Sequence, residues 1–209
     1  MNIAKNCVSR LSSYKNALTK LKNLGFTRVF SDNLADLISV TSSQVRKDFS
    51  LFGISGNRKG GYNIEELFNQ INHILGKDIV HNIIIVGAGY IGKALMKYKT
   101  FEKEGIKIRA VFDSDPAKIN RESSIPILPV KELKEFIQAQ RIKIGIITVP
   151  ENSAQLVLDQ MIDAGIQGVL NFAPINLKEY PGIIINNVNI ELELENVIYY
   201  TQTMENNKK

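Results

Sequence analysis

The sequence predicts an α/β protein in which an N-terminal winged helix precedes a Rossmann-type parallel sheet. Apolar residues recur at helical spacing over roughly the first fifty positions. A glycine-rich stretch follows at 53–62, and from His81 onward apolar, β-branched strands alternate with helical segments. We place the boundaries at 1–77 for the winged helix, 78–188 for the sheet domain and 189–209 for a C-terminal helix and tail.

Three helices are predicted before the glycine-rich stretch. The first covers roughly residues 5–24. The second starts at SDNLADLI with Ser31 as its N-cap, and the third is capped by Thr41 or Ser42 after a tight turn. The second and third helices are short and closely joined, which is the spacing of a helix-turn-helix. The loop GISGNRKGGY holds four glycines and two cations and is predicted to form a wing.

A linking helix is predicted over residues 64–75, and a sheet covered by helices on both faces follows it. The strand candidates are NIIIVG, IRAVFD, KIGIITVP, GVLNF and GIIINNV, and the stretch ENSAQLVLDQMIDAG is helical. Apolar, β-branched runs of this kind indicate buried strands of a parallel sheet. The last helix, IELELENVIYYTQTM, has an apolar set that must pack on its own sheet or on a partner subunit.

The composition excludes several classes of protein. No apolar run reaches the roughly 18 residues of a membrane span. The N-terminus MNIAKNCVSRLSSYK has no apolar signal-peptide core, so a cytoplasmic location is expected. Cys7 is the only cysteine and both histidines are distant in sequence, so neither a disulfide nor a metal site is expected. Cys7 is interpreted as a helical core residue, with a redox-sensing thiol as the alternative.

The positive charge is concentrated at the N-terminus. Residues 1–62 carry ten Lys or Arg against three Asp, whereas the remaining residues carry 16 basic and 18 acidic groups. A basic segment on a nearly neutral body indicates a polyanion partner for that segment, with a merely solvated basic face as the alternative.

A dinucleotide-binding turn is predicted at Gly87, Ala88, Gly89, Tyr90, Ile91 and Gly92. These residues fit GxGxxG, follow a predicted strand and open a predicted helix, which is the context that the motif requires. Gly87 permits the tight turn, Gly89 lets a pyrophosphate approach the backbone, and Gly92 lets helix and strand pack closely. The helix N-terminus then offers N–H groups to the phosphates.

Asp113 ends the next strand, 21 residues after Gly92. A carboxylate there can accept hydrogen bonds from the adenosine ribose, and it favours NAD(H) over NADP(H), whose 2′-phosphate it repels. Two further strand ends are expected to line the nicotinamide side, because ligands of open α/β sheets bind at the carboxyl ends of strands. These residues are Thr148, Val149 and Pro150, and Phe172, Ala173 and Pro174.

The same residues argue against an enzyme. A dehydrogenase needs a proton donor or acceptor near the reacting carbonyl. Neither His73 nor His81 falls at a strand C-terminus, and the chain has no YxxxK pair. We therefore expect a protein that binds NADH or NAD⁺ as a ligand, with a small NAD-dependent oxidoreductase as the alternative. A DNA-binding protein that answers to another adenine nucleotide or to CoA is a further alternative.

The third helix carries the residues expected to contact DNA. In a helix-turn-helix, the first turns of the second helix meet base edges in the major groove. Gln pairs with adenine, Arg or Lys pairs with guanine, and Ser binds phosphate. The wing cations are expected to reach the adjacent minor groove or backbone, and two copies on a twofold axis are expected. The predicted DNA-binding residues are Ser42, Ser43, Gln44, Arg46, Lys47, Arg58 and Lys59.

Taken in order, QVRKD, the wing ending GGY, VGAGYIG, FDSDP, TVP and LNFAP resemble the redox-sensing transcriptional repressors of the Rex family. The resemblance implies a homodimer with the last helix exchanged between subunits. It also implies binding to double-stranded palindromic operators, release by NADH and tolerance of NAD⁺. Tyr98 lies near the nicotinamide end in the family pattern and is implied in the switch.

Three positions depart from the family pattern. Lys59 stands in the wing where a glycine is usual, Asn16 stands where many members have an arginine, and Asn189 replaces the acid before the last helix. If that acid and arginine couple ligand state to domain position, this chain has lost both charges. We therefore expect DNA binding to be retained and the NADH response to be weakened or altered.

Overall fold

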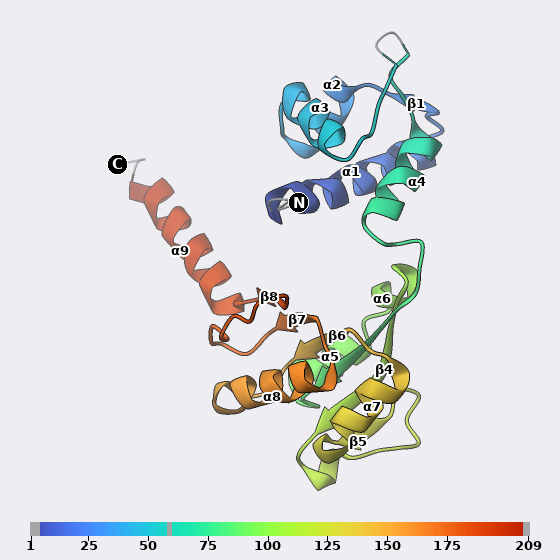
Figure 1. The fold of residues 1–209 in the computed structure, drawn as a ribbon. Coiled ribbons are helices and arrows are strands. Elements are labelled where there is room, and N and C mark those ends of the chain that lie inside the picture. The colour runs from blue at the N-terminus through green and yellow to red at the C-terminus, as the bar shows by residue number, and fades with distance from the viewer. Residues whose placement is uncertain (1–4, 58–59, 207–209) are drawn as a thin grey trace. The chain divides into compact units, whose positions relative to one another are not determined.

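The computed structural model describes residues 5–57 and 60–206, and the chain divides into two compact units (Figure 1). Unit 1 is Met1–Ile79 and unit 2 is Val80–Lys209. Arg58 and Lys59, the predicted wing cations, lie outside the described residues. In the part of the chain that is described, no helix has both the length and the apolar character needed to cross a membrane.

Unit 1 is a small helical domain with a two-stranded ribbon. The four helices of its described residues enclose a core that includes Leu11, Leu34, Phe49 and Leu67. The ribbon pairs β1 with β2 in antiparallel fashion, Arg28 opposite Asn63. The elements in order are α1 (Lys5–Asn23), β1 (Arg28–Val29), α2 (Ser31–Ile38), α3 (Ser42–Leu51), β2 (Tyr62–Asn63) and α4 (Ile64–Ile74).

The helix starts in unit 1 show which predicted caps the structure uses. Thr41 caps α3, because its hydroxyl oxygen accepts from the N–H of Gln44 at 3.1 Å. The prediction that Ser31 caps α2 is wrong by one residue, since Phe30 is the N-cap and Ser31 is already helical. Phe has no acceptor, so the side-chain oxygen of Asn33 instead accepts from the Phe30 N–H at 3.3 Å.

The described part of the glycine-rich stretch forms the base of a wing. Asn57 and Gly61 exchange backbone hydrogen bonds across it, at 3.0 and 2.8 Å. The Arg28 guanidinium donates to the Gly60 carbonyl at 2.9 Å, which attaches the wing base to β1. A helix-turn-helix followed by a wing is therefore present, as predicted.

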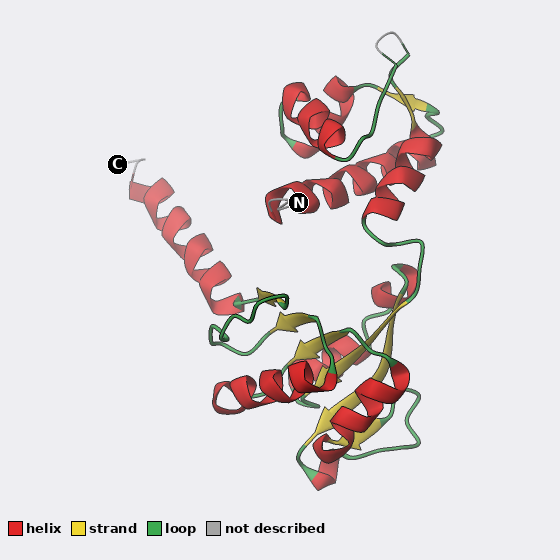
Figure 2. Ribbon diagram, viewed as in Figure 1, coloured by secondary structure: helices red, strands yellow, loops and turns green. Residues whose placement is uncertain are grey.

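Unit 2 is a six-stranded, wholly parallel sheet in the order β5-β4-β3-β6-β7-β8. Figure 2 shows the strands in yellow among red helices. This strand order is that of a Rossmann domain, with the switch point between β3 and β6. The strands are β3 (His81–Val86), β4 (Ile106–Asp113), β5 (Ile127–Pro129), β6 (Ile144–Ile147), β7 (Gly168–Asn171) and β8 (Ile184–Asn187).

The two faces of the sheet are covered by different helices. Successive residues of a strand point to opposite faces. Ile84 and Val86 pack with residues of α7 and α8, whereas Ile83 and Ile85 pack in a second cluster beside Leu95 of α5. The helices of unit 2 are α5 (Tyr90–Met96), α6 (Thr100–Lys103), α7 (Leu133–Gln140), α8 (Glu151–Ala164) and α9 (Ile190–Asn206). The predicted α/β class is thus confirmed.

Two parts of unit 2 were not resolved by the sequence pattern. The edge strand β5 was missed, because three residues ending in Pro129 are too few to show a period. The last helix was expected to pack on its own sheet or on a partner subunit; within this chain its side chains from Ile190 to Glu205 are all exposed, so it does not pack on its own sheet. Its apolar residues include Leu194 and Val197, about 60% exposed each.

Candidate functional site

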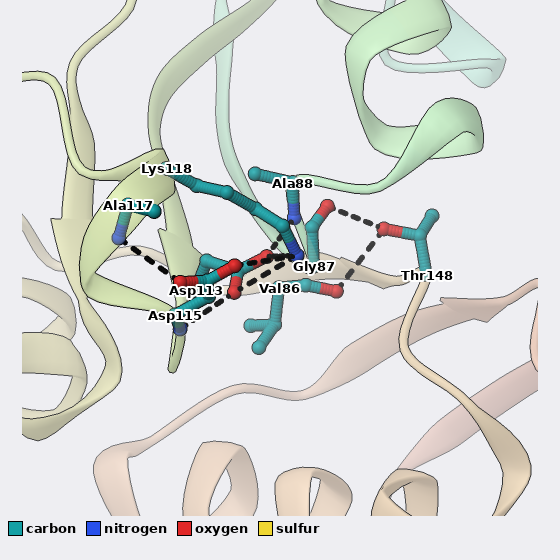
Figure 3. Close-up of polar contacts among 8 residues, drawn as sticks. All are labelled: Val86, Gly87, Ala88, Asp113, Asp115, Ala117, Lys118 and Thr148. Atoms are coloured by element: carbon teal, nitrogen blue, oxygen red, sulfur yellow. Dashed lines mark hydrogen bonds and ion pairs between the residues drawn. The ribbon is translucent and has the colours of Figure 1, made fainter.

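The glycine turn after β3 is built from close backbone contacts. Gly87 has φ +111°, and a Cβ there would lie 2.6 Å from the carbonyl oxygen of Thr148. A Cβ on Gly92 would overlap the carbonyl oxygen of Gly87. The Thr148 hydroxyl donates toward the carbonyls of Gly87 and Val86, at 2.8 and 3.1 Å (Figure 3). Gly87 and Gly92 are therefore required by the fold itself.

Gly89 differs from these two glycines. A Cβ on Gly89 would meet nothing within 4 Å, and the residue is not in the left-handed region, with φ −77°. The chain's own packing therefore does not require glycine at this position. Gly89 is the N-cap of α5, whose first N–H groups have no side-chain cap. The open space beside Gly89 is where a phosphate group can approach those N–H groups.

Asp113 ends β4, and its carboxylate is bonded by two backbone N–H groups and by one lysine. Its carboxylate accepts from the N–H of Ala88 at 2.7 Å and from the N–H of Asp115 at 2.9 Å (Figure 3). The ammonium of Lys118 lies 3.2 Å from Oδ2. Burial favours the protonated acid, but these hydrogen bonds and the Lys118 charge outweigh it and lower the pKa of Asp113.

The partners of Asp113 refine its predicted role. Two backbone N–H groups hold the carboxylate in place, and an ionised carboxylate has about four acceptor sites. Any ribose hydroxyl that bonds to Asp113 would share the remaining sites with Lys118, a residue of this hollow that the sequence reasoning missed. The signal for it was present, because Asp115 caps a short turn, η1 (Pro116–Lys118), that brings residue 118 back toward the strand end.

One hollow of about 620 Å³ is lined by six of the fourteen predicted dinucleotide-binding residues. It lies at the carboxyl ends of β3, β4 and β6, where the switch point of the sheet falls. Asp115, Lys118 and residues of α8 complete its lining. The predicted residues that line it are Gly87, Gly89, Asp113, Thr148, Val149 and Pro150.

The other residues of the glycine turn have backbone or packing roles. The Ala88 side chain is buried and Gly92 is packed against Gly87. The Tyr90 side chain is 98% exposed, and Ile91 is also exposed. Any contact that Tyr90 or Ile91 makes with a ligand in this hollow is therefore expected from the backbone.

The second predicted strand end is organised by Asn171, the last residue of β7. Its buried side-chain N–H₂ donates to the carbonyls of Ala173 and Ile175 and to the side chain of Asn187, at 2.9 to 3.2 Å. These bonds shape the turn that carries Phe172 and Pro174, of which only Pro174 is exposed. The turn follows the strand next to β6, but it is outside the lining of the hollow.

Tyr98 does not line the hollow at the glycine turn. Its ring is 54% exposed and stacks edge-on against Phe101 at 5.0 Å. Both rings line a separate hollow of about 770 Å³ between α6 and the start of β4. Within one copy of this chain, Tyr98 is thus outside the hollow that the glycine turn lines.

Helix α3 presents a polar, cationic face. Ser43, Arg46 and Lys47 are exposed, and Ser42 accepts a hydrogen bond from Arg46 at 3.3 Å. Val45 and Phe49 point to the core, fully buried. These positions agree with the predicted orientation of the helix. A hollow between this face and the wing base is lined by Phe30, Arg46 and Asn57, among others.

Gln44 lies at the edge of that face and contacts a buried carboxylate. Its Nε2 donates to Oδ1 of Asp48 at 2.8 Å. Asp48 is 2% exposed and also accepts from Arg10 through Nε and Nη2, at 2.6 and 2.7 Å. The hydroxyl of Tyr14 donates at 2.9 Å and the thiol of Cys7 at 3.4 Å. Helix α1 thereby holds α3 through one acid, which the sequence reasoning did not single out.

This network determines the protonation states that Asp48 and Cys7 favour. Burial favours the protonated acid, but the hydrogen bonds of the four donors outweigh burial and lower the pKa of Asp48 to about 2. Burial raises the pKa of the Cys7 thiol, and the hydrogen bond to Asp48 raises it further. Cys7 is therefore a buried core residue, and the thiolate that a redox sensor needs is disfavoured.

The structure describes two of the residues that depart from the family pattern, Asn189 and Asn16. Asn189 caps α9, since its side-chain oxygen accepts from the N–H of Leu192 at 3.0 Å. An amide caps a helix about as well as a carboxylate, so capping is kept although the charge is absent. Asn16 is exposed on α1 and lines a shallow hollow with Leu37 and Ile38 of α2.

Comparison with known families supports the two-unit arrangement. Residues 2–50 match a model described as a putative DNA-binding protein N-terminus, and residues 78–175 match one described as a CoA binding domain. The redox-sensing transcriptional repressor Rex of Clostridium botulinum strain Eklund 17B is 39% identical over 199 residues, which cover 95% of each chain. Rex of Clostridioides difficile strain 630 is 38% identical with the same coverage.

Solved structures agree with these relatives. RSP, a Rex-family repressor, in complex with β-NAD⁺ and operator DNA is 34% identical with a TM-score of 0.94, covering all of this chain and 96% of the other. RSP in complex with β-NADH is also 34% identical, with a TM-score of 0.88 and coverage of 100% and 98%. Identity at this level over nearly the whole length, together with the winged helix and the Rossmann turn, places the chain in the Rex family of redox-sensing transcriptional repressors.

Proposed function

We propose that this chain represses transcription by binding a palindromic operator and is released from it by NADH. The observation that carries this proposal is the pairing of two features in one chain. Unit 1 has a recognition helix with a cationic face, and unit 2 has a glycine turn whose Gly89 faces open space. RSP has been solved with operator DNA and with both NAD⁺ and NADH, which supports the same pair of ligands here.

On the DNA side, α3 is proposed to enter the major groove. Arg46 and Lys47 are exposed there and can donate to guanine O6 and N7 or to phosphates. Ser42 and Ser43, at the first turn, are suited to phosphate oxygens. The wing cations Arg58 and Lys59 are proposed to contact the neighbouring minor groove or its backbone.

On the ligand side, the hollow at the ends of β3, β4 and β6 is proposed to hold the dinucleotide. Gly89 and the N–H groups of α5 fit the pyrophosphate, Asp113 fits the adenosine ribose, and Thr148 to Pro150 lie toward the nicotinamide half. The turn at Phe172 to Pro174 is proposed to extend the nicotinamide side. The family consists of repressors, so the dinucleotide is a ligand and is not consumed.

We further propose a homodimer in which α9 crosses to the partner subunit. The apolar side chains Leu192, Leu194, Val197, Ile198 and Met204 of α9 are all exposed, and the described part of the chain leaves them uncovered. Tyr98 is proposed to lie at the dimer interface, near the nicotinamide, and to take part in the change of arrangement that NADH causes. A twofold dimer places two recognition helices on a palindrome.

Release by NADH requires a difference in affinity between two arrangements of the dimer. A ligand that binds both arrangements equally does not change their populations. To change the ratio of the two populations from 1:99 to 99:1, the ligand must bind the favoured arrangement about 10⁴-fold more tightly. Because Asn16 and Asn189 are uncharged, any ion pair through these positions is absent. We therefore propose a smaller preference, and hence a weaker NADH response, than a relative with both charges has.

The first experiment measures operator binding while NADH and NAD⁺ are titrated separately at one salt concentration. Salt must be constant because a protein with about 6–10 phosphate contacts loses on the order of 10³–10⁵ in affinity between about 50 and 200 mM. Release by NADH and not by NAD⁺ is expected, with CoA and ATP as control ligands. Tight operator binding that ignores both dinucleotides would contradict the proposed sensor.

A glycine substitution separates the ligand site from the fold. Gly89→Ala places a methyl group in the open space where the pyrophosphate is proposed to lie, so NADH binding should weaken by about tenfold or more while the protein keeps its melting temperature. Gly168→Ala is the matched control, because its Cβ would make an ordinary contact at 3.7 Å with Ile144 at the opposite end of the sheet. Equal NADH affinity in both variants would place the ligand elsewhere.

The oligomeric proposal has its own test. Val197→Asp puts a charge in the apolar surface of α9 and should convert the dimer to monomer in sedimentation at micromolar concentration. Glu195→Lys, on the same helix, changes charge outside the apolar set and should leave the dimer intact. A monomeric wild-type protein would overturn the proposal.

A further inference from the structure

The hydrogen bond between Gln44 and Asp48 determines which end of the Gln44 amide faces the acid. An ionised carboxylate only accepts hydrogen bonds, so the group 2.8 Å from Oδ1 must be the N–H₂ of Gln44. The oxygen Oε1 then lies on the other arm of the planar amide. The assignment of the two amide ends, often ambiguous, is here set by the chemistry of the partner.

Asp48 is able to hold this orientation because it is itself held rigidly. Arg10 binds both of its oxygens, and Tyr14 donates to Oδ2, the oxygen that Gln44 does not contact. The acid is 2% exposed, so water does not replace these partners. A charge-assisted hydrogen bond from such an acid restrains the amide more strongly than a bond to water does.

The position of Gln44 in α3 makes the contact informative. Gln44 is the third residue after Thr41, the position at which a capping-box glutamine accepts from the N-cap N–H. Its amide is instead directed along the helix to Asp48, one turn further on. Gln44 is partly exposed at the edge of the face that carries Arg46 and Lys47. The side chain thus connects the buried acid to the proposed DNA surface.

The orientation has a consequence for base reading. Adenine offers N6–H₂ as a donor and N7 as an acceptor in the major groove, whereas guanine offers two acceptors, O6 and N7. A free glutamine can turn its N–H₂ to guanine as readily as it pairs with adenine. With one N–H bound to Asp48, the amide offers its oxygen and its second N–H, which match adenine. The same oxygen faces an acceptor when the base is guanine.

We propose that Asp48 is a positioning residue that holds the Gln44 amide in the orientation that selects adenine over guanine at one base pair of each operator half-site. This inference rests on the proposed DNA-binding function and adds to it the origin of specificity at one position. Arg10 holds Asp48 through both of its oxygens, and Gln44 makes the base contact.

The test measures base preference separately from affinity. Each A·T pair of a palindromic, A/T-rich operator is replaced symmetrically by G·C, and the ratio of the two affinities is measured for each pair. Gln44→Ala should reduce the adenine-to-guanine ratio at one pair by about tenfold. Asp48→Asn should reduce the ratio at that same pair toward one and leave the ratios at the other pairs within twofold. Gln44→Ala combined with Asp48→Asn should add no further loss.

Tyr14→Phe is the matched control. It removes one donor from Oδ2 and leaves the bond from Gln44 to Oδ1, so stability should fall while the ratio at the Gln44 pair stays at the wild-type value. A uniform loss of affinity in Asp48→Asn, with every ratio unchanged, would reduce Asp48 to a structural role and overturn the inference. A wild-type protein that does not distinguish the operator from scrambled DNA would instead overturn the proposed function.

A measurement on the unsubstituted protein avoids dependence on how well Asp48→Asn folds. The side-chain N–H₂ resonances of Gln44, assigned by their loss in Gln44→Ala, should show slow rotation and one strongly shifted proton in the free protein. Resonances like those of a solvent-exposed glutamine would overturn the inference.

Discussion

Asp48 in unit 1 and Asp113 in unit 2 are both buried acids with lowered pKa, but their partners differ in kind. Asp48 is bonded by side chains of α1 and α3, and it is outside the lining of the hollow at the glycine turn. Asp113 is bonded by two backbone N–H groups and by the partly exposed Lys118, and it lines the hollow that is proposed to hold the dinucleotide. The first acid joins two helices, whereas the second is held in place with acceptor capacity left over. Burial and a lowered pKa alone do not distinguish these roles.

The largest expected effect comes from deleting the closed network. Asp48→Ala leaves the Arg10 guanidinium, 27% exposed, without its partner and should destabilise unit 1 by about 3 kcal/mol. Asp113→Ala removes one acceptor beside a solvent-accessible hollow and should destabilise unit 2 by about 1–2 kcal/mol. Hydrogen exchange resolved by segment measures both units in the full chain. Equal losses of unfolding free energy in the two variants would show that the two acids do not differ in their contribution to stability.

A smaller effect follows from pH. The pKa of Asp48 is about 2 in the folded protein, below its ordinary value, so its stabilisation is present above about pH 4 and is lost as the pH falls toward 2. The contribution is on the order of 2 kcal/mol. The stability difference between wild type and Asp48→Asn should therefore be full at pH 7 and narrow at pH 2.5. A difference that is the same at both pH values would show that Asp48 is not ionised in the fold.

The smallest effect concerns Lys118. Lys118→Gln removes a partly exposed cation, so stability should change by less than about 0.5 kcal/mol. The same change leaves Asp113 and Asp115 without a neutralising charge beside the ribose. Discrimination against NADPH relative to NADH should then rise by about two- to fivefold. Titration of both dinucleotides measures the ratio, and Lys131→Gln, a lysine outside the hollow's lining, is the control.

The local patterns of the sequence determined a large part of this protein. The GxGxxG turn, the helix-turn-helix and the alternation of strands with helices depend on residues close in the chain, and the structure contains all three. Thr41 as a helix cap also follows from its immediate neighbours. Periodicity and turn chemistry act over a few residues, which is why they are readable without the fold.

The tertiary structure decided what depends on residues far apart. Asp48 meets Arg10 across 38 positions, and nothing near Asp48 in the chain distinguishes a buried acid from a solvated one. The short edge strand β5 exists because β4 offers it backbone partners, not because of its own pattern. Lys118 reaches Asp113 only through the turn that follows β4. Such contacts form only when the chain folds in three dimensions. The sequence alone therefore predicted the two binding modules but not the bonds that Asp48 makes with α1 or the contact of Lys118 with Asp113.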